Sequence, residues 1–485
     1  MKMIKPTAAA AGALSLCMVL HAAGTKGMAA ETALSKQDIK RADSPVGMLA
    51  EGEFRGRLRI NTFRWNWREE SPAKRDNWAA AVGGSLLYDS AEFRGLNSMA
   101  GLYTSQNPWH MESGDVGFLK AGKDTTDRYS VKKTGDWGVT VLAQAYLQYR
   151  FSETKVRFGR QIFESLLTSA NDTKMIPNTF YGLSLISNDL YETTVKAALF
   201  SRQKLRGHTR FHDVLTYRNA EGDSWANNDD SAVNRSLTYQ KFVSAGLDPN
   251  HDLVVLEASA SPTASLKLKT NYTAVPGVVS SATLEAHYTV RVDGYKIVPG
   301  VRYMKQYDGL DGRLGAVANL KGDTTGYAAP ESLDGRLFAA RIDIEGDSAW
   351  KLRLGYSKVA DEADIVAPWR GFPTGGFTRA MGQYNWYADT ETYMVRGDYS
   401  FDEAGLVPGL SVMFRYAIQN FDDTKPGVQA DTTVLHLDAT ERFRSFPGLE
   451  TRLRIAFADG DAQSAPIPKE NPSYSEYRFE LNYFF

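Results

Sequence analysis

Two arginines, Arg452 and Arg454, stand two positions apart in the segment TRLRIAF, where they alternate with Leu453, Ile455 and Phe457. In a β-strand successive side chains point to opposite faces, so the two guanidinium groups share one face and the apolar side chains share the other. Guanidinium groups fixed on the wall of a water-filled pore can bind carboxylates through two parallel hydrogen bonds. The pattern therefore predicts a surface that guides carboxylate-bearing solutes.

Other arginines take the same polar position in other predicted strands. The candidates for a basic track are Arg57, Arg59, Arg302, Arg353, Arg396, Arg415, Arg452 and Arg454. The same face also carries Arg150, Arg157, Arg291 and Arg478. In an alternative interpretation, the arginines only neutralise acidic side chains of the same wall. Those acids are Glu285, Asp343, Asp398 and Glu480.

The segment 157–188 holds a second group of candidates. Its middle, Glu164–Asn178, follows a predicted strand, lacks alternation and is rich in Leu, Ile and Met, which is unusual for a loop surrounded by water. We expect an inward-folded constriction loop near 160–182, although an external loop packed on its neighbours is the alternative. Its candidate residues are Asp172, Lys174 and Pro177. In this hypothesis arginines draw the anionic group of a solute, and acids near the constriction hold any cationic end.

Signals for other chemistry are weak. His208 and His212 are four residues apart, but the region has no helical period, so we expect no metal site. We find no phosphate-binding glycine loop and no GxSxG motif, and we expect neither a cofactor nor enzymatic activity. An outer-membrane barrel enzyme, a protease or phospholipase with a His–Ser or His–Asp site at its rim, is the alternative. The seven histidines neither show nor exclude it.

The strand that best shows how these side chains are positioned is the terminal one, Tyr474–Phe485, which reads YSEYRFELNYFF. Its aromatic and aliphatic residues alternate with arginine, glutamate and asparagine, and it ends on an aromatic residue. Apolar side chains toward lipid and polar side chains toward internal water are typical of a transmembrane β-barrel. We predict the closing strand of an outer-membrane barrel, recognised by the barrel-assembly machinery through Phe485. An amphipathic strand of a soluble secreted β-protein is the alternative.

Similar alternation recurs along the chain. Predicted strands lie at Glu53–Trp67, Ala145–Phe151, Ser281–Val292, 335–345, 349–357, 391–401, 410–419, 432–444 and 450–458. Short turns at 345–348, 407–410 and 446–449 alternate with long polar stretches at 358–390, 420–431 and 459–473. This asymmetry is typical of outer-membrane barrels, and the length fits about 16–20 antiparallel up-and-down strands. A barrel of that size encloses an aqueous channel.

Composition agrees with this all-β fold class. The chain has 485 residues, mean hydropathy −0.36 and formal net charge −1, and the near-balance of charge argues against a nucleic-acid partner. Past the N-terminus no apolar run approaches the roughly 18 residues of a spanning helix. The only cysteine is Cys17, so we expect no disulfides. We predict a signal peptide at 1–30, a flexible periplasmic leader at 31–50 and the barrel at 51–485.

Several stretches resemble the OprD family of outer-membrane porins. They are FGRQ at 158–161, NDTKMIPNTFYG at 171–182, GFTRAMGQYNWYAD at 376–389, LVPGLSVMFRY at 406–416 and GLETRLRIA at 448–456. The resemblance implies an 18-stranded barrel with periplasmic termini in a Gram-negative outer membrane, an inward constriction loop and a ladder of basic residues. It also implies passage of amino acids, peptides or aromatic acids, or of sugars in some relatives.

By this resemblance, Arg415, Arg452 and Arg454 are the best ladder candidates, and Arg57 and Arg59 are plausible ones. Asp172 takes the acidic position of the loop. Lys174 replaces the usual arginine, which keeps the charge and loses the planar fork. We therefore expect passive diffusion of small, carboxylate-bearing solutes through a pore surrounded by outer-membrane lipid. The preferred solute, and the choice between a monomer and a homotrimer, stay open.

Overall fold

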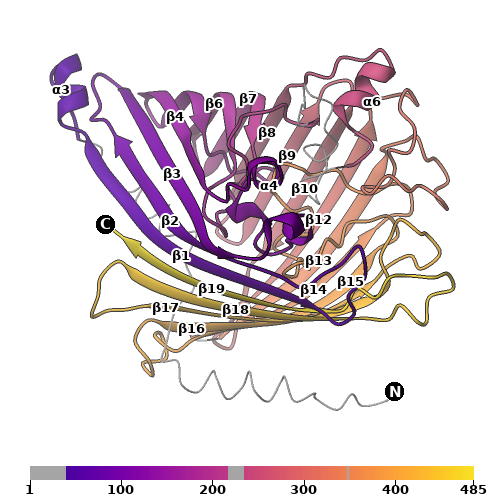
Figure 1. Ribbon diagram of the computed structural model, residues 1–485. Coiled ribbons are helices and arrows are strands. Elements are labelled where there is room, and N and C mark those ends of the chain that lie inside the picture. The colour runs from indigo at the N-terminus through magenta and orange to yellow at the C-terminus, as the bar shows by residue number, and fades with distance from the viewer. Residues whose placement is uncertain (1–39, 217–233, 347–348) are drawn as a thin grey trace.

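The computed structural model describes residues 40–216, 234–346 and 349–485, which form one closed antiparallel β-sheet (Figure 1). The sheet contains 19 strand segments in this part of the chain. Segments β10 and β11 both pair with β12 and are separated only by Thr289, so they are one interrupted strand and the barrel has 18 strands. The predicted fold class is confirmed.

The strands follow one another around the barrel in chain order. Their bounds are β1 Glu53–Trp67, β2 Asn77–Asp89, β3 Leu96–His110, β4 Val139–Phe151, β5 Thr154–Gln161, β6 Thr179–Leu190, β7 Thr193–Lys204, β8 Leu253–Ala260, β9 Leu266–Val275, β10 Val279–Tyr288, β11 Val290–Val292, β12 Tyr295–Asp308, β13 Gly335–Glu345, β14 Trp350–Val359, β15 Glu391–Ser400, β16 Leu410–Asn420, β17 Thr432–Arg442, β18 Leu449–Gly460 and β19 Tyr474–Phe484. The short helices described are α3 Pro45–Ala50, η2 Ser113–Phe118, η3 Lys123–Thr125, α4 Arg128–Thr134 and α6 Tyr239–Ser244.

Strand β19 closes the barrel against β1. The two strands pair antiparallel from Arg57 opposite Phe484 to Trp67 opposite Tyr474, and Figure 1 shows indigo β1 beside yellow β19. The start of β1 and the end of β19 therefore lie at the same end of the barrel. Pairing of the first strand with the last leaves no free sheet edge.

The two faces of the wall have opposite character. Along β1, Phe54, Leu58 and Ile60 are exposed on the outside, while Arg57 and Arg59 are buried on the inside. A soluble β-sandwich buries its apolar face, whereas a barrel in lipid turns that face outward. No helix in the described ranges is long and apolar enough to span a membrane.

Connections at the two ends of the barrel differ in length. At the end that carries the start of β1, residues 152–153, 191–192 and 293–294 make two-residue turns. Left-handed backbone at Asp293 (φ 47°) and Gly294 (φ 82°) matches the right-handed twist of the flanking strands. The opposite end carries long connections, among them 111–138, 205–252, 309–334 and 360–390. The predicted asymmetry is present, although residues 347 and 348 of the expected turn 345–348 lie outside the described residues.

The largest apolar core lies inside the barrel and not within the wall. It joins Phe163 and Leu167 after β5, Leu310 after β12, and Trp369 and Trp386 after β14 to inward side chains of neighbouring strands. Long loops therefore fill part of the lumen with packed apolar side chains. The remaining, polar part is where a water-filled path can run.

The predicted signal peptide at 1–30, and the part of the predicted leader up to residue 39, lie outside the described residues. The described remainder of the leader contains α3, whose first turn is capped by Ser44 Oγ accepting from Gly47 N at 2.9 Å. Before the helix, Ala42 N donates to Glu92 O at 2.9 Å. This segment is therefore attached to the connection between β2 and β3.

Candidate functional site

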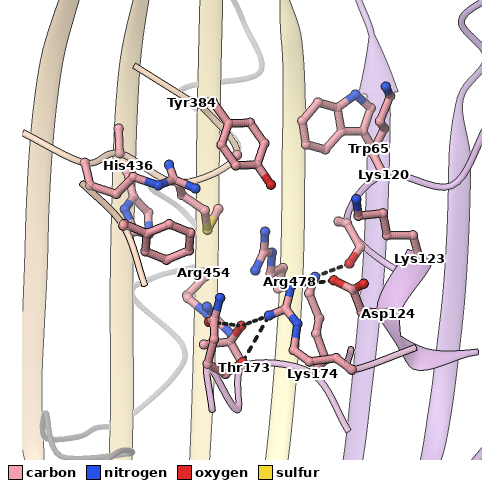
Figure 2. A pocket seen from close by; sticks show the side chains of 18 of the residues that line it. Trp65, Lys120, Lys123, Asp124, Thr173, Lys174, Tyr384, His436, Arg454 and Arg478 are labelled. Carbon is pink, nitrogen blue, oxygen red and sulfur yellow. Dashed lines mark hydrogen bonds and ion pairs between the residues drawn. The ribbon is translucent and has the colours of Figure 1, made fainter. Parts of the chain in front are cut away.

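A cavity of about 950 Å³ lies in the polar part of the lumen (Figure 2). One side is formed by β15 to β19 together with residues 379–384 of the loop 360–390. The other side is formed by Trp65 of β1, the loops 111–138 and 162–178, and Arg206 and Arg235. Among the described residues, thirteen lysines and arginines line this cavity, but only two acids, Asp124 and Asp438. Such a surface favours anions, because nearby low-dielectric walls focus the field of the fixed charges.

A row of basic side chains crosses the strand side of the lumen. Strand register places Arg353 opposite Arg396, Arg396 opposite Arg415, and Arg415 opposite His436, on four successive strands. Directly opposed residues of antiparallel strands point to the same face, about 5 Å apart. Arg396, Arg415 and His436 line the cavity, and Arg353 does not.

A second group, Arg452, Arg454 and Arg478, lines the cavity from β18 and β19. Each is paired with an acid of the wall. Arg452 donates to both oxygens of Asp438, at 2.8 and 2.6 Å, while Arg454 pairs with Glu480 and Arg478 with Glu476. Arg396 likewise donates to both oxygens of Asp398. These guanidinium groups are held rigidly, and much of their charge is balanced.

Arg302 and Arg353 contact a loop and do not line the cavity. Arg302 Nη1 donates to the carbonyl oxygens of Pro373, at 2.6 Å, and Gly375, at 3.0 Å, while its other nitrogens bind Glu285. Arg353 Nη1 donates to Gly376 O at 2.8 Å, and the rest of its guanidinium binds Asp343 at 2.6 and 2.9 Å. Both arginines thus fix the loop 360–390 to the wall.

The loop 162–178 reaches across the lumen to β1. Asp172 Oδ2 accepts from Arg57 Nη2 at 2.5 Å, and Asp172 Oδ1 accepts from Arg59 Nη1 at 2.7 Å. Arg59 Nη2 also contacts Glu480 at 3.2 Å. Burial raises the pKa of Asp172, but Arg57 and Arg59 outweigh burial and lower it to about 2. The carboxylate is therefore ionised at neutral pH and attaches the loop to the wall.

The other two loop candidates are also buried. Lys174 donates to the carbonyl oxygen of Ala121, its ammonium lies 4.1 Å from the centre of the Phe63 ring, and it lines the cavity. Burial, Arg478 and Arg206 hold the pKa of Lys174 well below its ordinary value. Pro177 O accepts from Lys204 Nζ at 3.1 Å. The loop therefore packs against both the wall and loop 111–138.

Several basic side chains that line the cavity were not singled out by sequence, among them Arg379, His436 and Lys120. Arg379 lies in the stretch 376–389, whose family resemblance was a usable signal. His436 alternates onto the polar face of β17, which was a second usable signal. Lys120 sits in a loop without any period, and nothing in the sequence marks it.

The histidine pair expected not to hold a metal is packed edge to face. The ring centres of His208 and His212 are 4.9 Å apart, and His212 Nδ1 is 2.7 Å from Asp213 O. Burial lowers the pKa of His212 to about 3. Among the described residues no group of three or more potential ligands could hold a metal ion.

Comparisons with known proteins agree with this architecture. The family model described as outer membrane porin, OprD family, matches residues 119–243, which include loop 162–178. None of the curated proteins matches the sequence.

Solved structures match nearly the whole barrel. OccK9 (OpdG) of Pseudomonas aeruginosa superposes with a TM-score of 0.69 at 16% identity, covering 90% of this chain and 99% of that one. OccAB3 of Acinetobacter baumannii gives 0.67 at 16% identity, covering 90% of this chain and all of that one. The structure of Pseudomonas aeruginosa OpdK with vanillate gives a TM-score of 0.65 at 16% identity, covering 90% of this chain and 100% of that one.

The family match and the fold point to the same class of protein. Porins are channels, and neither comparison supports the alternative of a barrel enzyme. The chain is an outer-membrane β-barrel that is similar to the OprD family of outer membrane porins in sequence over residues 119–243 and to Occ porins in fold.

Proposed function

We propose that the protein gives passive, selective passage to small hydrophilic solutes that carry a carboxylate, such as amino acids, peptides or organic acids. The carboxylate moves along basic side chains of β15 to β19. Loop 162–178, through Asp172, Lys174 and Pro177, limits the size of the solute. Lipid contact by the outer face and recognition of the terminal strand by the barrel-assembly machinery belong to the same proposal.

The observation that carries the proposal is the cross-strand row Arg396, Arg415 and His436 on the cavity surface. Arg452 and Arg454 continue the basic surface on β18. Closely spaced hydrogen-bond donors, with positive charge on the arginines, let a carboxylate exchange one partner for the next without becoming fully dehydrated.

The predicted track residues divide into three groups by their contacts. Arg396, Arg415, Arg452 and Arg454 line the cavity and would meet the solute directly. Arg57 and Arg59 act indirectly, because they hold Asp172 of the loop. Arg302 and Arg353 also act indirectly, through the loop 360–390.

Replacement of Arg415 by glutamine tests this proposal in planar bilayers. One unit charge acting through water over a few ångströms contributes below about 1 kcal/mol. We therefore expect reversal potentials in a salt gradient to report an anion-to-cation permeability ratio about threefold lower, corresponding to about 0.6 kcal/mol. Arg415→Lys keeps the charge and should retain most of the selectivity.

Arg336→Gln is the matched control. It removes the same charge from an exposed residue at the loop end of β13, where Arg336 pairs with Glu362 outside the cavity. An unchanged permeability ratio in Arg415→Gln, or an equal change in Arg336→Gln, contradicts the proposed track.

A further inference from the structure

We propose that the cavity selects solutes with two carboxylates, one held by Arg379 and Arg415 and the other by Lys120 of loop 111–138. This inference rests on the proposed function and narrows its substrate class. The cavity offers cationic groups on two facing sides and, in the part of the chain that the structure describes, no accessible acid that is free to receive a cation. A dicarboxylate therefore matches it better than either a monocarboxylate or an amino acid.

The strand side of the cavity contains polar groups that no described side chain satisfies. Nε of Arg415, and Nε and Nη1 of Arg379, are buried and make no hydrogen bond, and neither ring nitrogen of His436 makes one. His436 is only 5% exposed. Arg415 Nη1 donates to Arg379 O, which brings the two arginines together. Both arginines also line the cavity, and no acid of the described chain forms an ion pair with either of them, so a carboxylate here meets positive charge that no acid already balances.

Arg379 is held in place by aromatic rings. Its guanidinium carbon lies 4.6 Å from the centre of the Phe372 ring, 5.4 Å from Tyr384 and 5.6 Å from Trp386. Burial lowers the pKa of Arg379 to about 10, which leaves it charged at neutral pH. The rings fix its position without neutralising its charge.

The loop side of the cavity presents Lys120. Its ammonium lies 5.6 Å from the centre of the Trp67 ring, and no ion pair joins it to an acid in the described part of the chain. Figure 2 shows Lys120 and Lys123 on one side of the cavity, with His436 and Tyr384 on the other. A solute between these sides can present one carboxylate to each.

The acids around the cavity that belong to the described ranges already bind basic side chains. Asp438 accepts two hydrogen bonds from Arg452, and Asp124 binds Arg206 and Arg370. Glu476 and Glu480 are almost fully buried and do not line the cavity. An ammonium group on the solute would therefore lie near Lys120 or an arginine and would find no free carboxylate to bind. Its interaction with these like charges is repulsive.

The charge of Lys120 responds to pH near neutrality. Burial lowers its pKa to about 8, helped by Lys123 and Arg128 of its own loop, Arg235 of loop 205–252 and Lys74 after β1. The ammonium is largely charged at pH 7 and largely neutral at pH 9. Capture of the second carboxylate should weaken over that interval.

Three four-carbon probes of similar size test the inference with purified protein in planar bilayers. Butyrate carries one carboxylate, succinate carries two, and γ-aminobutyrate carries one carboxylate and one ammonium. We expect succinate to block ion current at about tenfold lower concentration than butyrate at pH 7, because it gains a second charge-assisted contact. We expect γ-aminobutyrate to block more weakly than succinate.

Lys120→Gln should raise the half-blocking concentration of succinate about tenfold and that of butyrate by no more than about threefold, because butyrate loses only the general field of the charge. Lys132→Gln, which removes an exposed lysine of α4 in the same loop, is the matched control and should change neither value. From pH 7 to pH 9 the succinate block should weaken in the unmodified protein, and the Lys120→Gln variant should lack this change.

The outcomes separate this inference from the proposed function. Equal block by succinate and butyrate, in a channel that still prefers anions, overturns the inference and leaves the proposed function standing. An equal loss of butyrate and succinate block in Lys120→Gln also overturns it. A channel with no anion preference overturns both.

Discussion

Asp172→Asn tests whether one carboxylate holds the loop 162–178 against β1. The carboxylate is bound by Arg57 at 2.5 Å and by Arg59 at 2.7 Å, and all three side chains are at most 9% exposed. Asparagine has nearly the same shape and no charge. Loss of one partner from a buried ion pair costs about 3–5 kcal/mol, because the remaining charges stay buried without balance.

The lower end of that range applies here. Arg59 keeps a second acid, Glu480, at 3.2 Å, so about 3 kcal/mol is the expected loss. A fall of the Asp172 pKa from 3.8 to about 2 corresponds to about 2–3 kcal/mol, in agreement. Because the pKa is lower in the folded state, this stabilisation is present above about pH 4 and is lost as pH falls through about 2.

A loss of about 3 kcal/mol raises the ratio of released to attached loop about 150-fold. Single-channel recording at pH 7 should show a larger mean conductance and frequent transitions between levels in Asp172→Asn. Asp172→Glu keeps the charge and should show fewer transitions between conductance levels than Asp172→Asn. Asp311→Asn, at an exposed acid in the loop after β12, should behave like the unmodified protein. Unchanged conductance and gating in Asp172→Asn would refute the argument that this ion pair positions the loop.

Two further predictions concern the wall. Arg302→Gln removes the hydrogen bonds to Pro373 O and Gly375 O, which should loosen the attachment of the loop 360–390 to the wall. Limited trypsin digestion should therefore cleave after Arg379 faster than in the unmodified protein. An equal rate would show that other contacts hold the loop. Gly84→Ala places a Cβ onto the Arg57 carbonyl oxygen and should lower the free energy of unfolding by about 2 kcal/mol, measured in urea titrations followed by circular dichroism. The control Gly114→Ala adds a Cβ in open space and should leave the free energy of unfolding unchanged. Equal stability of both variants would contradict the close approach of β1 and β2.

Strand positions were predictable because a spanning strand repeats every two residues. The expected strand Glu53–Trp67 coincides with β1, and the stretch 335–345 coincides with β13. Strand 281–292 was predicted as one piece, whereas the structure interrupts it at Thr289, whose N donates to Ser265 O at 2.8 Å. A side-chain period carries no information about such a local break in pairing.

The site was only partly predictable, for a related reason. Alternation places Arg302 and Arg415 on the same inner face, but it cannot tell whether a loop or the cavity meets that face. Arg302 binds loop carbonyls, and Arg415 lines the cavity. Contacts between loops distant in sequence decide the difference, as they do for Lys120, which no periodic pattern could place.

Under the proposed function, the unpaired arginines matter because the lumen is divided into a filled apolar part and an open basic part. Apolar packing around Trp369 and Trp386 fills one part of the lumen, so solutes are directed toward the basic strands. Along those strands Arg396, Arg452 and Arg454 are each balanced by an acid, and their fields largely cancel at a distance. Arg415 and Arg379 have no such partner in the described chain, so these two, with Lys120 across the cavity, should contribute strongly to the field that selects anions.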